Sequence, residues 1–315
     1  MKKIMLLFIL LIIIKSSYSQ KPVWFQDEKT QKIGFKDETG KITIQPKYDK
    51  AFQFEDKNYT AVNIGFNYEK DIGGKWGIMD TKGKIIIPIK YDNAQCLDYN
   101  LFALNIGHIF SNMDAMPYGK IAIFNALGKQ LTPFIYSGFL TAIQFEEGFA
   151  ILETNDKKNG QQYGLLDSTG KVALPANFQF INGFNEGFCL ISKNNKYGFL
   201  DKKLKMIIPL QYDDARSFFE GLAAVKLNEK WGFIDKLNKE VISFQYEKVK
   251  PFHEGYAAAQ LNKKWGVINK SNQVIVDFQY EDIVWIKKDA NEIRIKKGNK
   301  YFEVDRQGNE MKKNK

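Results

Sequence analysis

The sequence predicts an all-β protein built from tandem repeats, and three observations support this prediction. A motif of the form Lys-aromatic-Gly-apolar-apolar-Asp recurs along the chain, most clearly at Lys230–Asp235 and, with a final Asn, at Lys264–Asn269. Turn-forming residues separate short alternating segments at regular intervals, which is typical of hairpins. No segment keeps a 3.6-residue apolar period with helix caps. The 315 residues would otherwise suggest two or three domains, but internal repeats replace that expectation.

The repeat has a basic period of 34 residues. Successive steps between the glycine positions of the motif are 43, 45, 42, 34, 34, 34 and 36 residues, so the first three steps carry insertions. We number the repeats one to eight by these positions, of which the third and eighth are degenerate: Gly34, Gly77, Ala122, Gly164, Gly198, Gly232, Gly266 and Phe302.

Each repeat is expected to form an antiparallel meander of three strands. In repeat six the first strand is residues 222–227 and the second is the motif at 230–235, with Asn228 in the tight turn between them. A turn closed by Gly leads to the third strand, where a recurrent Pro suggests a sheet edge or a strand end. A Tyr-Asp or Tyr-Glu pair follows, and it adds a fourth strand if it pairs. Both faces of such a meander are apolar or small, so successive repeats must stack. The motif glycine is expected to leave room for a neighbouring aromatic ring or backbone.

Whole repeats at both ends predict an open curved solenoid of about eight repeats. The array begins with the strand-like segment 23–25 and ends with 310–312, so no strand exchange is needed to complete a repeat. The alternative is a closed propeller-like ring. The chain is thus divided into a signal peptide at 1–19, the repeat array at 20–310 and a basic C-terminal tail at 311–315.

These motifs together resemble the bacterial WG (KWG) repeat family. The resemblance rests on Lys-Trp-Gly-Phe-Ile-Asp at 230–235, with Gly-Lys, Ile-Pro, Tyr-Asp and Phe-x-Glu-Gly at fixed offsets, and it covers nearly all of the chain after residue 19. It implies tandem all-β units in bacterial, often exported proteins. It implies no active site, because the family has no assigned reaction and no agreed functional residues. Repeats three and eight depart most from its pattern.

The first nineteen residues have the form of a secretory signal peptide. Lysines at 2–3 precede an unbroken apolar run at 4–14, and Ser-Tyr-Ser at 17–19 places small residues before a cleavage at Gln20. The run is too short to span a bilayer. We expect export to the periplasm, the outer surface or the medium, with no transmembrane segment in the mature chain. An uncleaved membrane anchor is the alternative.

The basic charge does not indicate a nucleic-acid partner. The formal charge of +10 falls to +7 without the three lysines of the leader, which leaves 43 basic against 36 acidic residues. Nucleic-acid modules concentrate Lys and Arg on one face. Here the lysines alternate with acidic residues, and the arginines are Arg216, Arg294 and Arg306.

Histidines and cysteines are too few for the common catalytic and metal sites. His108 and His253 fall in different repeats and are expected in exposed loops. Cys96 and Cys189 fall at different places in non-adjacent repeats, which favours buried thiols over a disulfide. No phosphate-binding loop, dinucleotide fingerprint or zinc-protease motif is present. The sequence therefore predicts no enzyme activity, no cofactor and no metal site.

Carboxylates are plentiful, and a pair of them would suit a glycan-acting hydrolase or lyase. Most, however, sit at recurring positions of the repeat and are expected to be structural, whereas a catalytic pair should break the repeat. The recurring ones are the turn residues Asp80, Asp167, Asp201 and Asp235 and the residues before glycine, Glu147, Glu186, Glu220 and Glu254. Mild departures occur at Asp98, Asp114 and the Glu146–Glu147 pair.

The departures of most interest are three insertions between the first and second strands of repeats two, three and four. They are Ile64–Gly74, Asn105–Gly119 and Asn155–Gln162, and equivalent loops of stacked repeats should project from one edge. Neutral drift of loop length is the alternative interpretation. The candidate partner-binding residues in them are Phe66, Tyr68, His108, Phe110, Met113, Met116 and Tyr118.

These observations favour a non-catalytic secreted or envelope-associated scaffold that binds a protein or glycan partner through the enlarged loops. Deleting residues 107–117 is expected to leave the fold intact and to abolish partner capture. A glycan-acting hydrolase or lyase with carboxylates at the rim is the alternative.

Overall fold

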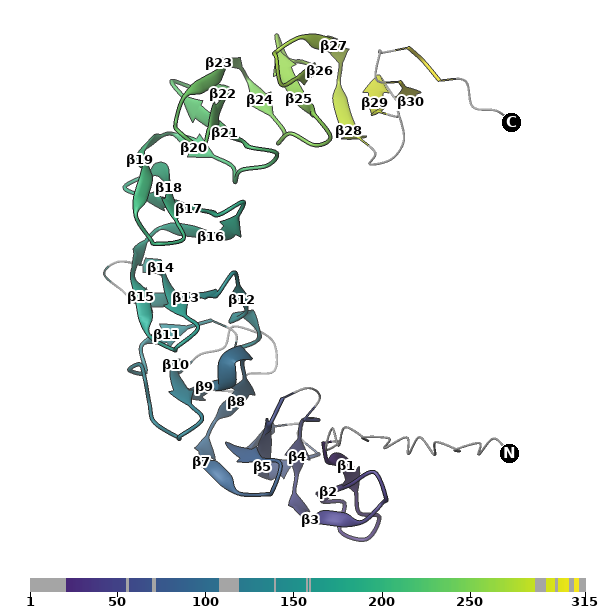
Figure 1. The fold of residues 1–315 in the computed structure, drawn as a ribbon. Coiled ribbons are helices and arrows are strands. Elements are labelled where there is room, and N and C mark those ends of the chain that lie inside the picture. Colours follow the sequence, from purple (N-terminus) through teal and green to yellow (C-terminus); the bar gives the residue numbers. More distant parts are fainter. Residues whose placement is uncertain are drawn as a thin grey trace, which may run out of the picture. The chain divides into compact units, whose positions relative to one another are not determined.

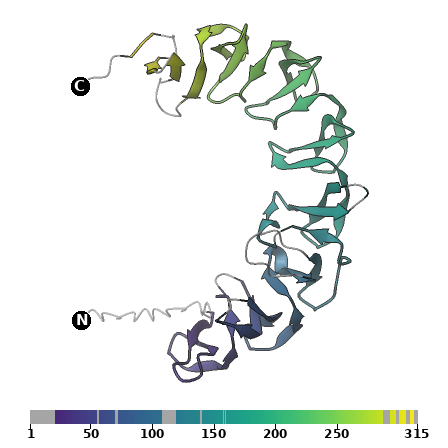
Figure 2. The ribbon, with the colours of Figure 1, turned by 180° about the vertical axis from the view of Figure 1, so that it is seen from behind.

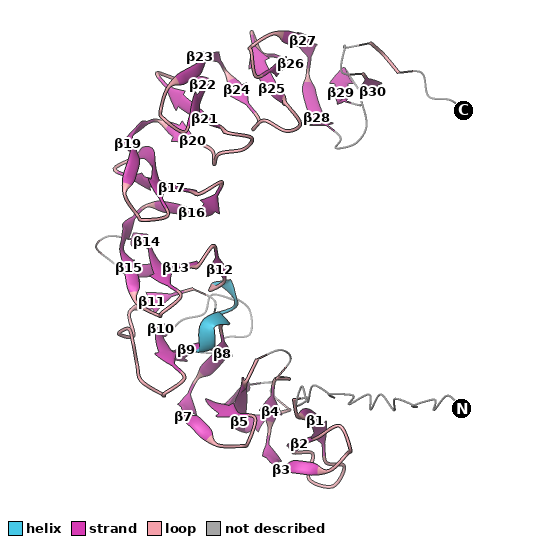
Figure 3. Ribbon diagram, viewed as in Figure 1, coloured by secondary structure: helices cyan, strands magenta, loops and turns pink. Residues whose placement is uncertain are grey.

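The computed structural model describes residues 21–311 apart from 55–56, 70–71, 108–118, 139, 157, 159, 287–292, 298–299 and 306–308. Strands and turns make up almost all of this part of the chain. Its helical elements are two single 3-10 turns, η1 (Asp98–Asn100) and η2 (Leu140–Ala142) (Figure 3). The predicted all-β class is confirmed. The chain divides into an N-terminal unit, Met1–Cys96, and a C-terminal unit, Leu97–Lys315.

The N-terminal unit contains two small antiparallel sheets, one of β1 to β3 and one of β4 to β7, followed by β8 (Figure 1). The strands are β1 (Val23–Gln26), β2 (Ile33–Lys36), β3 (Ile42–Tyr48), β4 (Lys50–Ala51), β5 (Tyr59–Asn67), β6 (Ile72–Asp80), β7 (Ile85–Tyr91) and β8 (Asn93–Cys96).

The C-terminal unit contains one large sheet and a series of smaller ones (Figure 2). The large sheet runs in the order β15-β14-β13-β11-β10-β9, with β12 paired to β13, and sheets β16–β19, β20–β23, β24–β27 and β28–β30 follow in chain order. The strands of the large sheet are β9 (Leu101–Ile106), β10 (Lys120–Asn125), β11 (Tyr136–Ser137), β12 (Phe145–Glu146), β13 (Phe149–Asp156), β14 (Gly160–Asp167) and β15 (Val172–Phe178). The others are β16 (Phe180–Asn185), β17 (Phe188–Lys193), β18 (Lys196–Asp201), β19 (Met206–Tyr212), β20 (Asp214–Ala215), β21 (Leu222–Leu227), β22 (Lys230–Asp235), β23 (Glu240–Tyr246), β24 (Lys248–Val249), β25 (Tyr256–Leu261), β26 (Lys264–Asn269), β27 (Val274–Tyr280), β28 (Asp282–Ile286), β29 (Ile293–Lys297) and β30 (Lys300–Val304).

The regular sheet has four strands, one more than the expected meander of three. The segment after each Tyr-Asp or Tyr-Glu pair forms a short strand along the first strand of the next repeat, as β20 does beside β21 with Asp214 opposite Lys226. This extra strand links one repeat to the next, because its residues belong to the end of one repeat and pair with the beginning of another.

The motif glycine is required by the approach of the third strand. A Cβ placed on Gly232 would lie 2.6 Å from the carbonyl oxygen of Ile242, and one on Gly266 would lie 2.6 Å from that of Val276. The third strand is irregular at this point, since the register of β22 against β23 shifts on either side of Phe233. The expectation that the glycine leaves room for a neighbouring backbone is confirmed.

The recurrent proline marks a sheet edge but not a strand end. Pro209 lies inside β19, which is the outermost strand of its sheet and continues to Tyr212. It falls between the pairs Phe199–Ile208 and Tyr197–Tyr212, where the register shifts. A proline is tolerated there because it cannot donate a backbone hydrogen bond and the edge strand does not require one at that position.

Repeat three departs from the regular sheet where its glycine is replaced. Ala122 is fully buried in β10, at the position where the regular repeats carry the glycine that the third strand approaches closely. The following segment leaves the regular path, and the buried Thr132 hydroxyl accepts the Ile123 N–H at 2.9 Å instead. After a single bridge between Phe124 and Gln130, the chain next pairs with the sheet at the two-residue strand β11, which pairs with both β10 and β13.

The predicted turn role of the recurring aspartates is confirmed. In the turn after β22, the Asp235 carboxylate accepts the N–H groups of Leu237 and Lys239, both at 2.9 Å. Asn238 closes this turn with a φ of 63°, in the left-handed region that Asn tolerates.

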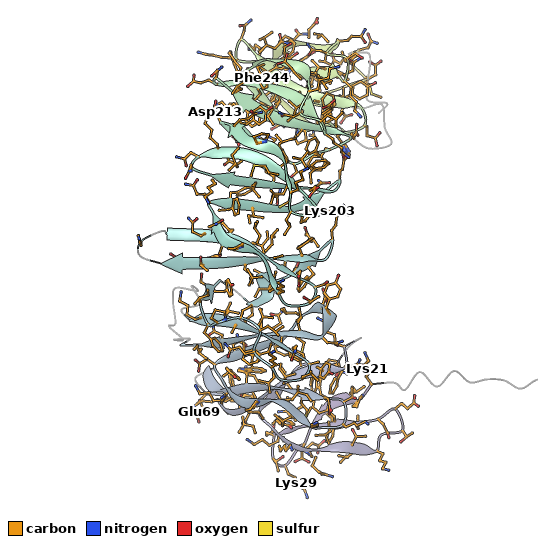
Figure 4. The ribbon with its side chains drawn as sticks, turned by 60° about the vertical axis from the view of Figure 1, so that its left-hand side comes forward. Lys21, Lys29, Glu69, Lys203, Asp213 and Phe244 are labelled. Atoms are coloured by element: carbon orange, nitrogen blue, oxygen red, sulfur yellow. The ribbon has the colours of Figure 1, made fainter. Side chains whose placement is uncertain are left out.

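The cores lie between successive sheets, where aromatic side chains from neighbouring repeats meet (Figure 4). Phe233 of one sheet packs on Phe252, which leads into the next, with ring centroids 4.7 Å apart. The buried Tyr246 donates its hydroxyl hydrogen to Asn272 of the following turn at 2.6 Å. The expected stacking of repeats is thus observed within each unit, and the open array and its alternative, a closed ring, stay predictions. Among the described residues no helix has the length and apolar character needed to cross a membrane.

Candidate functional site

The aspartates of the Tyr-Asp pairs fasten the edge of each sheet. Asp213 accepts hydrogen bonds from Lys196 Nζ at 2.6 Å and from the Asn228 N–H at 2.9 Å, and its side chain lies at the sheet edge (Figure 4). The hydrogen bond from Lys196 holds the pKa of Asp213 below its ordinary value. Asp49 is bonded in the same way, to Lys32 and to the Gly65 N–H. These carboxylates therefore form their hydrogen bonds within the chain.

The glutamates before glycine hold neighbouring repeats together. Glu220 accepts the Gly255 N–H of the next repeat at 2.9 Å and pairs with Lys270 Nζ at 3.1 Å. Glu186 binds Gly221 and Lys236 in the same geometry, at 3.0 Å and 3.1 Å. Sequence reasoning assigned these residues a structural role but could not identify partners 35 and 50 residues away.

A concave surface of about 390 Å³ in the N-terminal unit, which we call the aromatic groove, gathers exposed rings. Its exposed rings are Trp24 of β1 (44% exposed), Phe52 after β4 (56%) and Tyr68 at the turn after β5 (53%). Phe52 stacks on the buried Trp76 with centroids 5.4 Å apart. Such a concentration of exposed aromatic surface is unusual for a surface without a partner.

Internal contacts position the rings of the aromatic groove. Tyr68 donates its hydroxyl hydrogen to the carbonyl oxygen of Asp49 and meets Phe66 edge to face at 5.2 Å. Lys50 Nζ lies 3.5 Å from the centroid of Phe66. Partial burial, together with the Asp49 carboxylate, raises the pKa of Tyr68, so this hydroxyl stays a neutral donor. Contacts within the chain thus fix the positions of these rings.

The residue type at one position of the repeat varies, whereas the Trp that it contacts does not. Four residues after the Tyr of the Tyr-Asp or Tyr-Glu pair, a side chain covers the Trp of the motif in the same sheet. The covering pairs are Phe52 with Trp76, Arg216 with Trp231 at 5.3 Å and Lys250 with Trp265 at 5.6 Å. The Trp is buried in every case, whereas the side chain that covers it is aromatic in one repeat and cationic in two others. Variable side chains on a constant scaffold are typical of binding surfaces in repeat proteins.

Two of the seven candidate residues lie in the described part of the chain. Tyr68 lines the aromatic groove, and Phe66 supports it from the side. His108, Phe110, Met113, Met116 and Tyr118 lie outside the described residues, and their role stays a prediction.

Sequence reasoning missed Trp24 and Phe52. A signal for Phe52 was available, because it is aromatic where repeats six and seven carry cations. Two of the insertions extend strands: Ile64–Gly74 lengthens β5 and β6, and Asn155–Gln162 lengthens β13 and β14. Lys120 Nζ, the residue after the insertion of repeat three, contacts the carbonyl oxygen of Asn155, the first residue of the insertion of repeat four, at 3.3 Å.

A second concave surface of about 400 Å³, the polar groove, lies between successive sheets of the C-terminal unit. The residues that line it include Glu146, Phe180, Asn182, Arg216, Ser217 and Phe219. Asn182 Nδ2 donates to Ser217 Oγ at 2.9 Å, which joins two repeats across the floor of the groove.

The remaining reactive side chains are buried or isolated. Cys96 and Cys189 are both free thiols, and burial raises the pKa of each to about 12. His253 is exposed on its loop. In the part of the chain that the structure describes, no group of three His, Cys, Asp or Glu side chains could hold a metal ion.

Solved structures match the chain at low identity and low TM-score. AztD from Citrobacter koseri is 11% identical over 92% of this chain and 93% of its own, with a TM-score of 0.36. The uncharacterised protein lmo1340 from Listeria monocytogenes EGD-e is 12% identical over 93% of both chains, with a TM-score of 0.35. A likeness this weak carries no argument about function. No curated protein matches the chain.

The repeat itself identifies the family. The pattern described as "WG containing repeat" matches residues 33–68, 76–107, 163–197, 197–231, 231–265 and 265–301. These segments include the motif glycine of all six repeats that keep it, and together they cover more than half of the chain. The chain belongs to the WG-containing repeat family.

Proposed function

We propose that the chain is a non-catalytic exported scaffold that binds a protein or glycan partner, with the aromatic groove as its contact surface. The observation that carries the proposal is the convergence of Trp24, Phe52 and Tyr68, each about half exposed, around one concavity. Aromatic side chains dominate the energetics of interfaces, because each buries a large area at little conformational cost. Tyr68 comes from an insertion that breaks the repeat, as expected of an added binding element.

Export is part of this proposal and rests on the leader at 1–19. N-terminal sequencing of the protein purified from its own cells is expected to begin at Gln20. A chain that retains residues 1–19 would contradict cleavage.

The binding role is tested with the full mature chain immobilised as bait for purified envelope glycans and envelope proteins. We expect the wild type to retain a partner and the W24A/F52A/Y68A variant to lose at least about tenfold in affinity. Leu127→Ala and Leu237→Ala serve as matched controls, since both remove a highly exposed apolar side chain outside the groove. Equal retention by the triple variant would exclude the groove as the contact surface.

A further inference from the structure

We propose that the polar groove binds a neutral pyranose sugar. This groove belongs to the C-terminal unit and shares no residue with the aromatic groove, so the inference goes beyond the proposed function and stands separately from it. A volume of about 400 Å³ is within the usual range of small-ligand sites.

Glu146 places a carboxylate in the polar groove. Its carboxylate lies directly over Gly183 of β16, where a Cβ would come within 2.3 Å of Oε2. The neighbouring Glu147 pairs with Lys202 at 3.1 Å. Among the residues that the structure describes, the side chain of Glu146 has no hydrogen-bonding or ion-pair partner, although its backbone pairs with that of Phe149. A carboxylate seated in a groove without a partner is an acceptor available to a ligand.

Arg216 contributes a charge of opposite sign to the polar groove. Arg216 lines the same groove with its guanidinium 5.3 Å from the Trp231 ring, and no carboxylate pairs with it within the described chain. Glu146 and Arg216 are the charged residues of the lining, so its net charge is zero. Two unpaired charges of opposite sign favour a neutral ligand that both donates and accepts hydrogen bonds. Adjacent hydroxyls of a sugar do so.

The lining of the polar groove also contains aromatic rings and neutral polar side chains. Phe180 and Phe219 line the groove and are 38% and 41% exposed, which offers flat apolar faces for the C–H side of a pyranose ring. Asn182, Asn185 and Ser217 add neutral donors and acceptors. A single carboxylate lines this groove, whereas glycoside hydrolysis ordinarily needs two. The lining therefore suits binding without cleavage.

The test is saturation-transfer NMR with the full mature chain and four neutral probes: glucose, galactose, mannose and N-acetylglucosamine. At least one probe is expected to bind. Glu146→Gln and Gly183→Ala should each weaken that binding about tenfold, the first by removing the charged acceptor and the second by displacing it. Glu147→Gln is the matched control and should change binding less than about twofold, because its carboxylate is engaged by Lys202.

Three results would overturn the inference. They are no binding of any of the four sugars, equal loss in the Glu147→Gln control, or saturation transfer to free phenylalanine, a zwitterion with an aromatic ring, in place of the sugars. The W24A/F52A/Y68A variant should keep full sugar binding at this groove. Failure of this inference and failure of the proposed function are therefore distinguishable.

Discussion

Replacing the motif glycine by alanine should destabilise the protein through a backbone clash. In Gly232→Ala the new Cβ would stand 2.6 Å from the Ile242 carbonyl oxygen and 3.1 Å from the Phe244 N–H nitrogen. Real Cβ atoms essentially never approach within 3.0 Å. The third strand must therefore move away from β22, because the clashing atom belongs to its backbone and a change of side-chain rotamer cannot relieve the contact.

The magnitude follows from two opposing contributions. Overpacking of a filled site costs roughly 1–3 kcal/mol, and a strained register also weakens the flanking pairs Trp231–Tyr246 and Phe233–Ile242. The loss of chain freedom in the unfolded state offsets only about 0.4–1 kcal/mol. We expect a net loss of about 1–3 kcal/mol in the free energy of unfolding.

Urea unfolding followed by tryptophan fluorescence measures this loss, and Trp231 reports directly on the affected strand. Gly183→Ala is the matched control: it makes the same change in a strand, but the new Cβ meets only the flexible end of Glu146. That control should keep the wild-type stability or gain slightly. A Gly232→Ala variant as stable as the control would refute the clash. If Phe244→Ala restored the stability of Gly232→Ala, the new Cβ would clash with the Phe244 ring rather than with the backbone of the third strand.

Three further predictions concern the contacts between repeats and the buried thiols. Tyr246→Phe should cost about 1 kcal/mol in unfolding free energy by urea titration, because it removes a buried hydroxyl that donates to the next repeat; no loss would contradict that bond. Burial raises the pKa of Glu220, but the Gly255 N–H and Lys270 outweigh it, so the net pKa lies below the ordinary 4.5. A carboxyl depressed on folding stabilises the protein above its unfolded pKa, and this stability is lost as pH falls from about 4.5 through the lower folded pKa. Urea midpoints across pH 3–7 should therefore fall less steeply on acidification in Glu220→Gln than in the wild type, and parallel curves would contradict the linkage. Cys189 should resist thiol-specific labelling at pH 8 in the native state and react once unfolded, since burial raises its pKa to about 12; rapid native labelling would contradict its burial.

The repeat explains how much of the fold could be predicted. A Gly that recurs beside Trp in a strand indicates close packing, and Asp followed by a turn ending in Gly indicates a hairpin, so both features were predicted with their physical reason. The two-residue strand at Asp214–Ala215 was left open, because so short a segment has no periodicity. The bond from Glu220 to Gly255 joins residues that nothing in the local sequence pairs.

The candidate sites were only partly predictable. Tyr68 was identified because its insertion breaks the repeat, whereas Trp24 lies in an ordinary first strand and becomes part of a site only when neighbouring sheets stack. Glu146 was noticed as a departure from the pattern, but its position over Gly183 depends on how two repeats pack. Local patterns thus indicate which residues are unusual, and packing between repeats decides which of them meet.

The most direct test of the central claim, binding without turnover, combines retention and product analysis. The mature wild type is incubated with defined envelope glycans and proteins, and the bound and free fractions are analysed by mass spectrometry. The account predicts a partner that is retained intact and is lost with the W24A/F52A/Y68A substitutions. Release of cleaved product by the wild type, with Glu146→Gln abolishing it, would contradict the account and favour a glycan-acting enzyme.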